Sequence, residues 1–200
     1  MDELKFAVIG NPVSHSLSPD IHLFFASQFQ LERYTYNKIK SNENDFERDI
    51  NDFFKNGGVG LNVTVPFKGL AYNLCDELDQ SAGLCKSVNT VLIDSGKLIG
   101  HSTDGQGLID DFLHKEITLE DSKILIIGAG GSAASIISSL LFHGKIKEIS
   151  ILNRTKNNAL RLLDLFETNR LFMHEEGDEY DIVINTTPIS MNVDDIILPP

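Results

Sequence analysis

Short β-type runs and amphipathic stretches alternate along the first hundred residues. Residues 4–9 (LKFAVI) form a β-rich run that ends at the turn signal Gly10-Asn11-Pro12, and residues 34–39 alternate as a strand does. Between these runs, Ser18-Pro19 is typical of a helix start, with Ser18 as N-cap and Pro19 at the first helical position. Apolar residues then recur at helical spacing, which predicts one buried helix face: Ile21, Phe24, Phe25 and Phe29.

Further along the same half, a second apolar stripe of helical period stops at Gly57-Gly58; it consists of Phe46, Ile50, Phe53 and Phe54. Residues 59–65 are expected to form a strand that Pro66 interrupts. Residues 87–93 and 98–100 flank Asp94-Ser95-Gly96 and predict a hairpin.

The pattern changes near residue 104. After a predicted helix over 105–113, residues 123–127 (KILII) form a continuous apolar run, which suits a parallel strand buried on both faces. A helix to about residue 143, a strand over 148–152, a helix over 157–166 and a strand over 181–185 complete a β-α-β-α-β order. This order predicts an α/β chain with a doubly wound, Rossmann-like sheet over residues 104–200, preceded by an α/β domain over residues 1–103. The helix after residue 103 is expected to cross between the two domains.

A glycine loop follows the apolar strand directly and opens the next helix. It consists of Gly128, Ala129, Gly130, Gly131, Ser132 and Ala133. Glycines there let the backbone turn tightly and approach a pyrophosphate, and the helix start offers unpaired N–H groups. The strand–turn–helix context favours a dinucleotide site over the alternative, which is a tight turn in a sheet that binds nothing.

The end of the next strand bears on the choice of cofactor. NAD-binding sheets place a carboxylate there for the ribose hydroxyls, whereas an Arg accommodates the 2′-phosphate of NADP. The positions here hold no carboxylate; they are Asn153, Arg154, Thr155 and Lys156. The sequence therefore favours NADP(H) over NAD(H), with Arg154 able to stack on adenine and bind the phosphate. Asn153 and Thr155 are also suited to capping the following helix, and both roles are compatible.

Composition and charge narrow the range of partners that the chain could bind. The chain has 200 residues, 42% of them hydrophobic and 23% charged, which is ordinary for a globular protein. A net charge of −12 makes nucleic acid and anionic membrane surfaces poor partners. The two cysteines, Cys75 and Cys85, show no metal-ligand spacing, so no metal is expected. Without a recognisable signal peptide, the predicted location is the reducing cytoplasm.

Four polar motifs of the first half come at or just after predicted strands, where open α/β sheets bind ligands. They are G-N-P-x-x-H-S-x-S-P from Gly10, N-V-T-V-P-F-K from Asn62, V-N-T from Val88 and T-D-G from Thr103. G-A-G-G, N-R-T and N-T-T-P (Asn185 to Pro188) follow in the second half. This ordered set, which covers the whole chain, resembles the shikimate dehydrogenase family.

The resemblance implies reversible, NADPH-dependent reduction of 3-dehydroshikimate to shikimate, within the synthesis of chorismate and aromatic amino acids. It assigns Ser16 and Ser18 to the substrate carboxylate, and Thr64, Asn89 and Asp104 to the ring hydroxyls. It also assigns Lys68, paired with Asp104, to catalysis and Thr187 to the cofactor. The chemistry is consistent, because hydride transfer to a carbonyl creates an alkoxide that an ammonium group can protonate and stabilise.

Each residue also has a structural interpretation. Ser18 suits a plain N-cap, Asp104 a helix cap and Asn89 a hairpin position. Lys68 could be a solvated lysine in a first helical turn, but the helix dipole disfavours a cation there, which hints at another reason for it.

The chain departs from the family pattern in several places. Ser102 stands where Asn is usual before Thr-Asp-Gly, and Ser190 stands where Gly is usual. Family chains continue beyond Pro200 with a further strand, a loop and helices, so we expect a C-terminally shortened member with an incomplete second domain. Three alternatives to a shikimate dehydrogenase stay open: a quinate/shikimate dehydrogenase paralogue, a catalytically silent NADP- or substrate-binding protein, and a folate-linked dehydrogenase. The S-x-S-P cluster argues against the last, and the oligomeric state is expected to be a monomer or homodimer.

Overall fold

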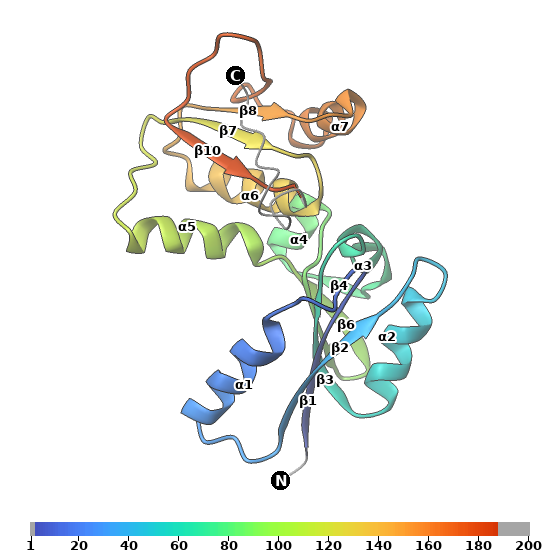
Figure 1. Cartoon of the computed structure of the whole chain (residues 1–200). Coiled ribbons are helices and arrows are strands. Elements are labelled where there is room, and N and C mark those ends of the chain that lie inside the picture. Colours follow the sequence, from blue (N-terminus) through green and yellow to red (C-terminus); the bar gives the residue numbers. More distant parts are fainter. Residues whose placement is uncertain (1–2, 188–200) are drawn as a thin grey trace. The chain divides into compact units, whose positions relative to one another are not determined.

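The computed structural model describes residues 3–187 (Figure 1). The chain divides into two compact units, Met1–Thr103 and Asp104–Pro200. Each is built around its own β-sheet. Ser190 and Pro188 lie outside the described residues. Within residues 3–187, no helix has both the length and the apolar character needed to cross a membrane.

The first unit contains a mixed six-stranded sheet in the order β2-β1-β3-β5-β6-β4. Its strands are β1 (Leu4–Gly10), β2 (Tyr34–Lys40), β3 (Gly58–Val63), β4 (Glu77–Leu78), β5 (Thr90–Asp94) and β6 (Lys97–His101). β1 pairs in parallel with β2 and β3, while β5 and β6 form the predicted antiparallel hairpin. The carboxyl ends of β1 and β3 therefore lie side by side, which brings the loops that follow them together.

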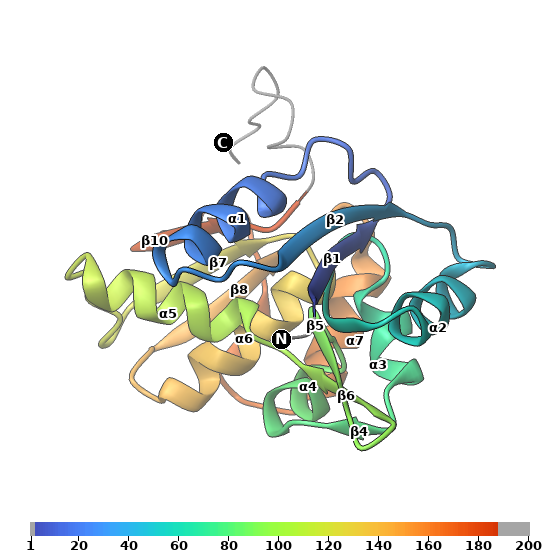
Figure 2. The same cartoon turned by 90° about the horizontal axis from the view of Figure 1, so that it is seen from below.

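The helices of the first unit are α1 (Ser18–Gln28), α2 (Phe46–Lys55), α3 (Lys68–Leu74) and α4 (Gln80–Cys85). Figures 1 and 2 show α1 and α2 on opposite faces of the sheet. Right-handed crossovers require this arrangement, because the chain moves from β1 out to β2 and then back past β1 to β3. The main core cluster holds side chains from α2, β1 and β3, including Ile50, Ile9, Leu61 and the ring of Phe67.

The predicted buried stripe of α1 is wrong. Phe24, Phe25 and Phe29 are 60%, 50% and 75% exposed, and the buried residue of the helix is Ala26. The side of α1 that faces the sheet carries His22 instead. Its imidazole stacks on Tyr36, with the ring centroids 4.3 Å apart. The periodicity identified a helix, but the apolar side chains of that helix do not face the sheet.

The predicted cap of α1 also needs correction. The helix begins at Ser18 itself, so Pro19 is the second helical residue, and Leu17 occupies the N-cap position without a side-chain hydrogen bond. Ser16 supplies the missing acceptor, since its Oγ receives the Ser18 N–H at 3.2 Å and donates to Ser18 Oγ at 3.1 Å. The two serines of the S-x-S-P motif are thus held against each other.

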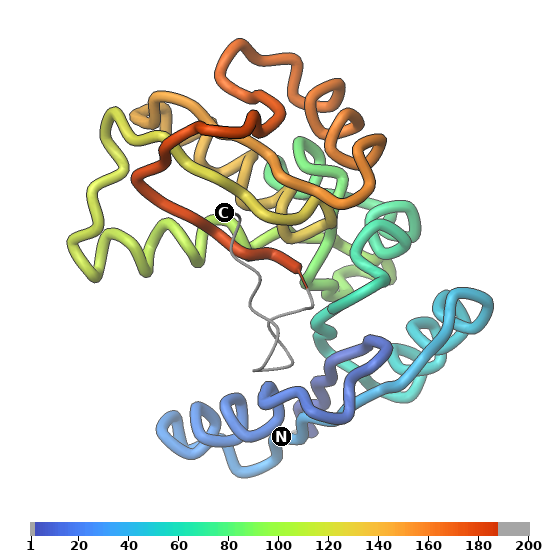
Figure 3. Tube along the Cα trace, turned by 45° about the horizontal axis from the view of Figure 1, so that its top comes forward, coloured from blue at the N-terminus to red at the C-terminus, as the bar shows by residue number. Residues whose placement is uncertain are grey.

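The second unit is the doubly wound arrangement that the sequence predicts. Its elements are α5 (Asp104–His114), β7 (Lys123–Ile127), α6 (Gly131–His143), β8 (Glu148–Leu152), α7 (Lys156–Phe166), β9 (Leu171–Met173) and β10 (Ile182–Asn185). The four strands are parallel, in the order β10-β7-β8-β9. Figure 3 traces the path of the chain through this unit, ending in red at β10. Ile124, Leu125 and Ile126 of β7 are almost fully buried, as a central strand covered on both faces requires.

The chain reverses its direction of travel across this sheet between β7 and β10. It runs outward from β7 to β8 and β9, and then returns to pair β10 with the other edge of β7. Open α/β sheets bind ligands beside the carboxyl ends of strands at such a switch point. The glycine loop that follows β7 and Thr186-Thr187, which follow β10, stand at this point.

Candidate active site

In the first unit, the loops after β1 and β3 are joined by backbone hydrogen bonds. The N–H of Thr64 donates to the Ile9 carbonyl and the N–H of Asn11 donates to the Val65 carbonyl, both at 2.9 Å. Gly10 makes this approach possible, because a Cβ there would overlap the methyl group of Thr64. These bonds therefore bring the serine motif next to the N-V-T motif, although the two are about fifty residues apart in the chain.

Two residues to which the sequence gave no role connect these motifs: Tyr36, and Asn62, which was quoted only as the start of its motif. The buried Tyr36 hydroxyl donates to Asn62 Oδ1 at 2.7 Å, and the Ser18 side chain acts on it by lowering the pKa of Tyr36 against the effect of burial. Asn62 Nδ2 in turn donates to Thr90 Oγ1 at 3.2 Å, next to Asn89. Burial raises the pKa of Tyr36 to about 12, so its hydroxyl stays a donor at neutral pH. Only the three-dimensional neighbours reveal this link, because Tyr36 reads in the sequence as an ordinary inward-facing strand residue.

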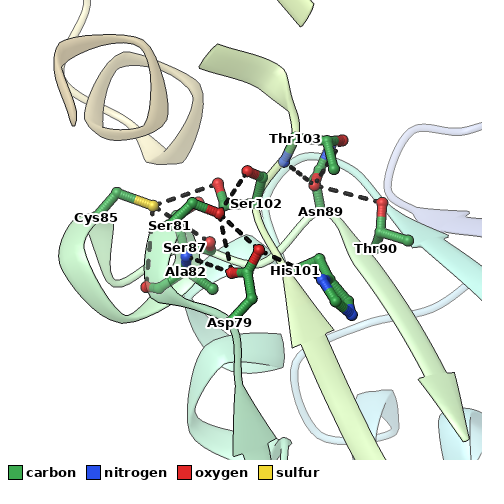
Figure 4. A network of polar contacts seen from close by, with 10 residues as sticks. All are labelled: Asp79, Ser81, Ala82, Cys85, Ser87, Asn89, Thr90, His101, Ser102 and Thr103. Atoms are coloured by element: carbon green, nitrogen blue, oxygen red, sulfur yellow. Dashed lines mark hydrogen bonds and ion pairs between the residues drawn. The ribbon is translucent and has the colours of Figure 1, made fainter. Parts of the chain in front are cut away.

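Asn89 is oriented by Thr103. The Thr103 N–H donates to Asn89 Oδ1 at 2.9 Å, and Asn89 Nδ2 donates to Thr103 Oγ1 at 2.9 Å (Figure 4). A backbone N–H donates only, so the atom facing it must be the amide oxygen, which fixes the orientation of the Asn89 amide. Thr103 is a second residue that the sequence analysis quoted in a motif without giving it a role.

Lys68 is the first residue of α3 and is half-buried. Its carbonyl accepts the Val88 N–H at 3.0 Å, which ties the start of α3 to the V-N-T motif. The backbone of the predicted catalytic lysine is therefore anchored beside the predicted substrate residue Asn89. The helix dipole disfavours a cation at the first position of a helix, so the local structure alone does not explain a lysine at position 68.

In the second unit, Asp104 begins α5 close to the first turns of α6. Ser132 Oγ lies 3.5 Å from Asp104 Oδ2, and the Gly105 N–H donates to Ser135 Oγ at 3.0 Å. Gly105 allows this contact, since a Cβ there would overlap the Ser135 carbonyl. The structure thus places one predicted catalytic residue beside the helix whose start is predicted to bind the cofactor.

The glycine loop forms a concave backbone turn. Gly128 has a φ of +112°, which favours glycine, and a Cβ there would overlap Thr186 Oγ1. Gly130 is the N-cap residue of α6, and a Cβ there would meet no atom within 4 Å. Gly131, Ser132 and Ala133 form the first turn of this 13-residue helix. An open helix start with a close-approaching glycine backbone fits the pyrophosphate of a dinucleotide.

The end of β8 presents the predicted basic cluster. Arg154, Thr155 and Lys156 are exposed and Asn153 is half-buried. α7 begins at Lys156, and Thr155 at its N-cap makes no side-chain capping bond, so the capping interpretation of Thr155 is wrong. Asn153 does not cap the helix start either; its Nδ2 donates to the Thr155 carbonyl at 2.8 Å. These side chains extend from the strand end that faces the cofactor position of Rossmann-like sheets.

Thr187 closes the loop after β10. Its N–H and its hydroxyl both donate to Asn185 Oδ1, at 2.9 and 2.7 Å. The N-T-T segment is therefore a side-chain-stabilised turn at the switch point. It leaves Thr187 half-buried near the carboxyl end of the strand adjacent to the glycine loop.

Taken together, the two units define a class: α/β proteins that join a Rossmann-like dinucleotide-binding sheet to a separate α/β unit with a polar site of its own. Comparison with known families agrees with this class. Residues 8–91 match the model of the shikimate dehydrogenase substrate binding domain, and residues 112–194 match that of shikimate / quinate 5-dehydrogenase. The chain belongs to the shikimate dehydrogenase family, as its motifs predicted.

Curated relatives share the full span of the chain. It is 41% identical over 202 residues to the shikimate dehydrogenase (NADP(+)) of Acinetobacter baumannii strain ACICU, covering 98% of this chain and 76% of the relative. The protein of the same name from Acinetobacter baylyi is 40% identical with the same coverage.

Solved structures are similar in both sequence and fold. Shikimate 5-dehydrogenase from Thermus thermophilus, in complex with NADP(H) and shikimate, is 32% identical with a TM-score of 0.82, covering 92% of this chain and 68% of that one. An Ael1 enzyme from Pseudomonas putida is 33% identical with a TM-score of 0.83, covering 99% and 73%. The ligand-free 5-ketofructose reductase of a Gluconobacter strain is 25% identical with a TM-score of 0.79, covering 94% and 70%.

Proposed function

We propose that this chain catalyses the reversible, NADPH-dependent reduction of 3-dehydroshikimate to shikimate. The observation that supports the proposal is that each unit carries one set of groups suited to one of the two reactants. In the first unit these are hydrogen-bonding side chains after β1, β3 and β6, with the backbone of Lys68 bonded to Val88; in the second they are the glycine loop after β7 and Arg154 after β8. The curated relatives are NADP-dependent shikimate dehydrogenases by name, and a structural relative was crystallised with both NADP(H) and shikimate.

In the first unit, the substrate is assigned to side chains that already bond one another. Ser16 and Ser18 present neighbouring hydroxyls and suit a carboxylate, which accepts two hydrogen bonds. Thr64 and Asn89, with Asp104 of the second unit, are assigned to the ring hydroxyls. The bonds from Tyr36 to Asn62 and from Asn62 to Thr90 support this assignment, because they link the strand beside Ser18 to the residue next to Asn89.

Lys68 is assigned the role of proton donor in the reduction. Reduction adds a hydride to the carbonyl carbon, the C=O π bond breaks, and the oxygen takes a proton from the ammonium Nζ of Lys68, which becomes a neutral amine. In the oxidative direction the same amine removes the hydroxyl proton. The pairing of Lys68 with Asp104 stays a prediction. A double-mutant cycle of Lys68→Ala and Asp104→Ala measures it, and additive losses would refute it.

The cofactor is assigned to backbone and basic groups of the second unit. NADPH, when bound, supplies the hydride. Gly128, Ala129, Gly130 and Gly131, with Ser132 and Ala133, offer N–H groups to the pyrophosphate, and Thr187 lines the adjacent strand end. Arg154 and Lys156, with Asn153 and Thr155, are assigned to the adenosine side, where a guanidinium group reads the 2′-phosphate that distinguishes NADP from NAD.

The test is a direct assay of this 200-residue chain. With 3-dehydroshikimate present, NADPH absorbance is expected to fall; with shikimate and NADP+ it is expected to rise. Quinate replaces shikimate in a parallel reaction, and faster oxidation of quinate would favour the paralogue. Calorimetric binding of NADPH and shikimate without turnover would identify a silent binding protein, and binding of neither would refute the family activity for this chain.

We further propose a location in the reducing cytoplasm and a monomer or homodimer. Both cysteines are unpaired, and burial raises the pKa of the thiol of Cys75 to about 11 and also raises that of Cys85, which disfavours the reactive thiolates. Cell fractionation and light scattering after gel filtration test the two statements separately.

A further inference from the structure

A short segment of the first unit, beside the proposed substrate half-site, is hydrogen-bonded to α4. The segment is Ser102-Thr103, which links β6 to α5. Ser102 is 5% exposed, whereas Thr103 is exposed. Figure 4 shows Ser81 and Asn89 on opposite sides of this segment. The peptide group between Ser102 and Thr103 therefore has one partner from helix α4 and another from the V-N-T motif.

The two partners bind the two ends of one peptide group. Ser81 Oγ donates to the Ser102 carbonyl oxygen at 2.8 Å, and the Thr103 N–H donates to Asn89 Oδ1 at 2.9 Å. A trans peptide is planar, and its C=O and N–H point in opposite directions. Rotating this peptide plane to weaken one of the two bonds therefore weakens the other as well. The hydroxyl of Ser81 and the amide of Asn89 are mechanically coupled through a rigid unit.

Ser81 is itself held by the start of α4. Its Oγ lies 2.9 Å from each Asp79 carboxylate oxygen, and Asp79 Oδ1 accepts the Ala82 N–H at 2.7 Å as the helix cap. A hydroxyl has one proton, so the Asp79 carboxylate and the Ser102 carbonyl share it. Of the three acceptor oxygens, the Ser102 carbonyl is the nearest to Ser81 Oγ, at 2.8 Å against 2.9 Å for each Asp79 oxygen.

Ser102 receives a further contact, since Cys85 Sγ of α4 lies 3.3 Å from its Oγ. The serine that replaces the usual asparagine of the family is thus embedded in bonds to α4 on both its backbone and its side chain. The residues that make these contacts are Asp79, Ser81, Cys85 and Ser102.

We propose that Ser81 is a positioning residue for the substrate half-site. By bonding the Ser102 carbonyl, it fixes the peptide plane whose N–H orients the Asn89 amide toward the substrate ring. The inference rests on the proposed function, which assigns Asn89 to a ring hydroxyl. Ser81 itself is not assigned to substrate or cofactor; its effect is transmitted through the peptide group and Asn89.

The main test is Ser81→Ala, with Ser81→Thr as the conservative variant that keeps the hydroxyl. The matched control is Ser27→Ala in α1, which also removes a hydroxyl that donates to a backbone carbonyl, Phe24, at 2.7 Å. We expect Ser81→Ala to raise KM and Kd for shikimate about three- to tenfold and to leave Kd for NADPH unchanged. Ser81→Thr and Ser27→Ala should stay within about twofold of the wild type. A general loss of packing would instead shift Tm without separating the two ligands.

The route through Asn89 has its own test. In an Asn89→Ala background, Ser81→Ala should no longer change Kd for shikimate, because the group it orients is gone. A further weakening in that background, or an unchanged Kd in Ser81→Ala alone, overturns the proposal. If Ser81→Ala does not yield folded protein, the isosteric pair Ser81→Thr and Ser81→Val makes the same comparison.

A measurement without ligand separates this inference from the proposed function. The two Nδ2 proton signals of Asn89, assigned by their absence in Asn89→Ala, should shift in the NMR spectrum of Ser81→Ala and not in that of Ser27→Ala. Unchanged signals overturn the positioning role whether or not the chain is active. Shifted signals in a chain that neither binds nor reduces 3-dehydroshikimate support the role of Ser81 and refute the proposed function.

Discussion

The proposed substrate half-site of the first unit is built from side chains that bond one another, whereas the proposed cofactor half-site of the second unit is built mainly from backbone. Tyr36, Asn62 and Thr90 form a continuous run of hydrogen bonds, and Ser16 and Ser18 bond each other. The glycine loop after β7 offers N–H groups of a tight turn and a helix start, and Arg154 and Lys156 are exposed just after β8. The difference suits the two ligands: a small ring with several hydroxyls needs side chains at fixed positions, while a phosphate is satisfied by any well-placed N–H groups.

The largest expected effect tests the chemistry of the first unit. Lys68→Ala removes the proton donor and should lower kcat by about 10²- to 10⁴-fold, while Kd for shikimate changes by less than about threefold. Lys55→Ala, at an exposed position in the last turn of α2, is the matched control and should leave both unchanged. Stopped-flow single turnovers with calorimetry make the comparison, and full activity in Lys68→Ala would remove Lys68 from the mechanism.

The next largest effect tests the backbone character of the second unit. Gly128→Ala places a Cβ against Thr186 Oγ1 at a φ of +112°, so we expect a loss of about 1–3 kcal/mol in the free energy of unfolding together with weaker NADPH binding. Gly130→Ala is the matched control, because its Cβ meets no protein atom within 4 Å. It should weaken NADPH binding while changing stability by only a few tenths of a kcal/mol. If Gly130→Ala binds NADPH normally, the loop does not approach the pyrophosphate.

A smaller effect distinguishes the exposed charges from the backbone. Arg154→Ala should raise KM for NADPH about tenfold and leave KM for NADH unchanged, because only NADPH carries the 2′-phosphate. Arg161→Ala, an exposed arginine of α7, provides the control for net charge. Equal changes for both cofactors would show that another group binds the 2′-phosphate. Raising the salt concentration should shrink the difference, since the arginine is exposed.

The smallest effect tests the side-chain network. Tyr36→Phe leaves Asn62 Oδ1 without its 2.7 Å donor and should cost about 1 kcal/mol of stability and a few-fold in KM for shikimate. Burial raises the pKa of Tyr36 to about 12. Above its usual pKa near 10 the unfolded state loses this proton and the folded state keeps it, so stability falls between about pH 10 and pH 12. That alkaline decline, measured by urea titration, should be smaller in Tyr36→Phe.

The two units also differ in how far the sequence alone predicted them. The parallel sheet of the second unit was predicted in order, because a continuous apolar strand such as KILII and a glycine loop are local signals. The short strand β9 and the short helix α4 were not predicted, since three to six residues carry little periodicity. The longer elements are predictable because a Rossmann-like sheet requires strands and helices to alternate along the chain.

In the first unit, the site motifs were recognisable but their connections were not. Tyr36, Asn62 and Thr103 act through partners 14 to 28 positions away in the chain, which no local pattern encodes. The predicted burial of the apolar face of α1 was also wrong. Periodicity shows that a helix has an apolar side but not which element that side contacts. Ser-Pro is a frequent helix start and therefore favours Ser18 as the cap, but the actual acceptor, Ser16, lies two residues earlier.

The exposed face of α1 has a consequence for handling the protein. Phe24, Phe25 and Phe29 present large apolar rings to water, and such surfaces attract one another in solution. A net charge of −12 opposes that attraction at low ionic strength. Added salt screens the repulsion over roughly 10 Å at 0.1 M and leaves the attraction in place. The protein should therefore be most soluble in dilute buffer, and its light scattering should rise as sodium chloride is added.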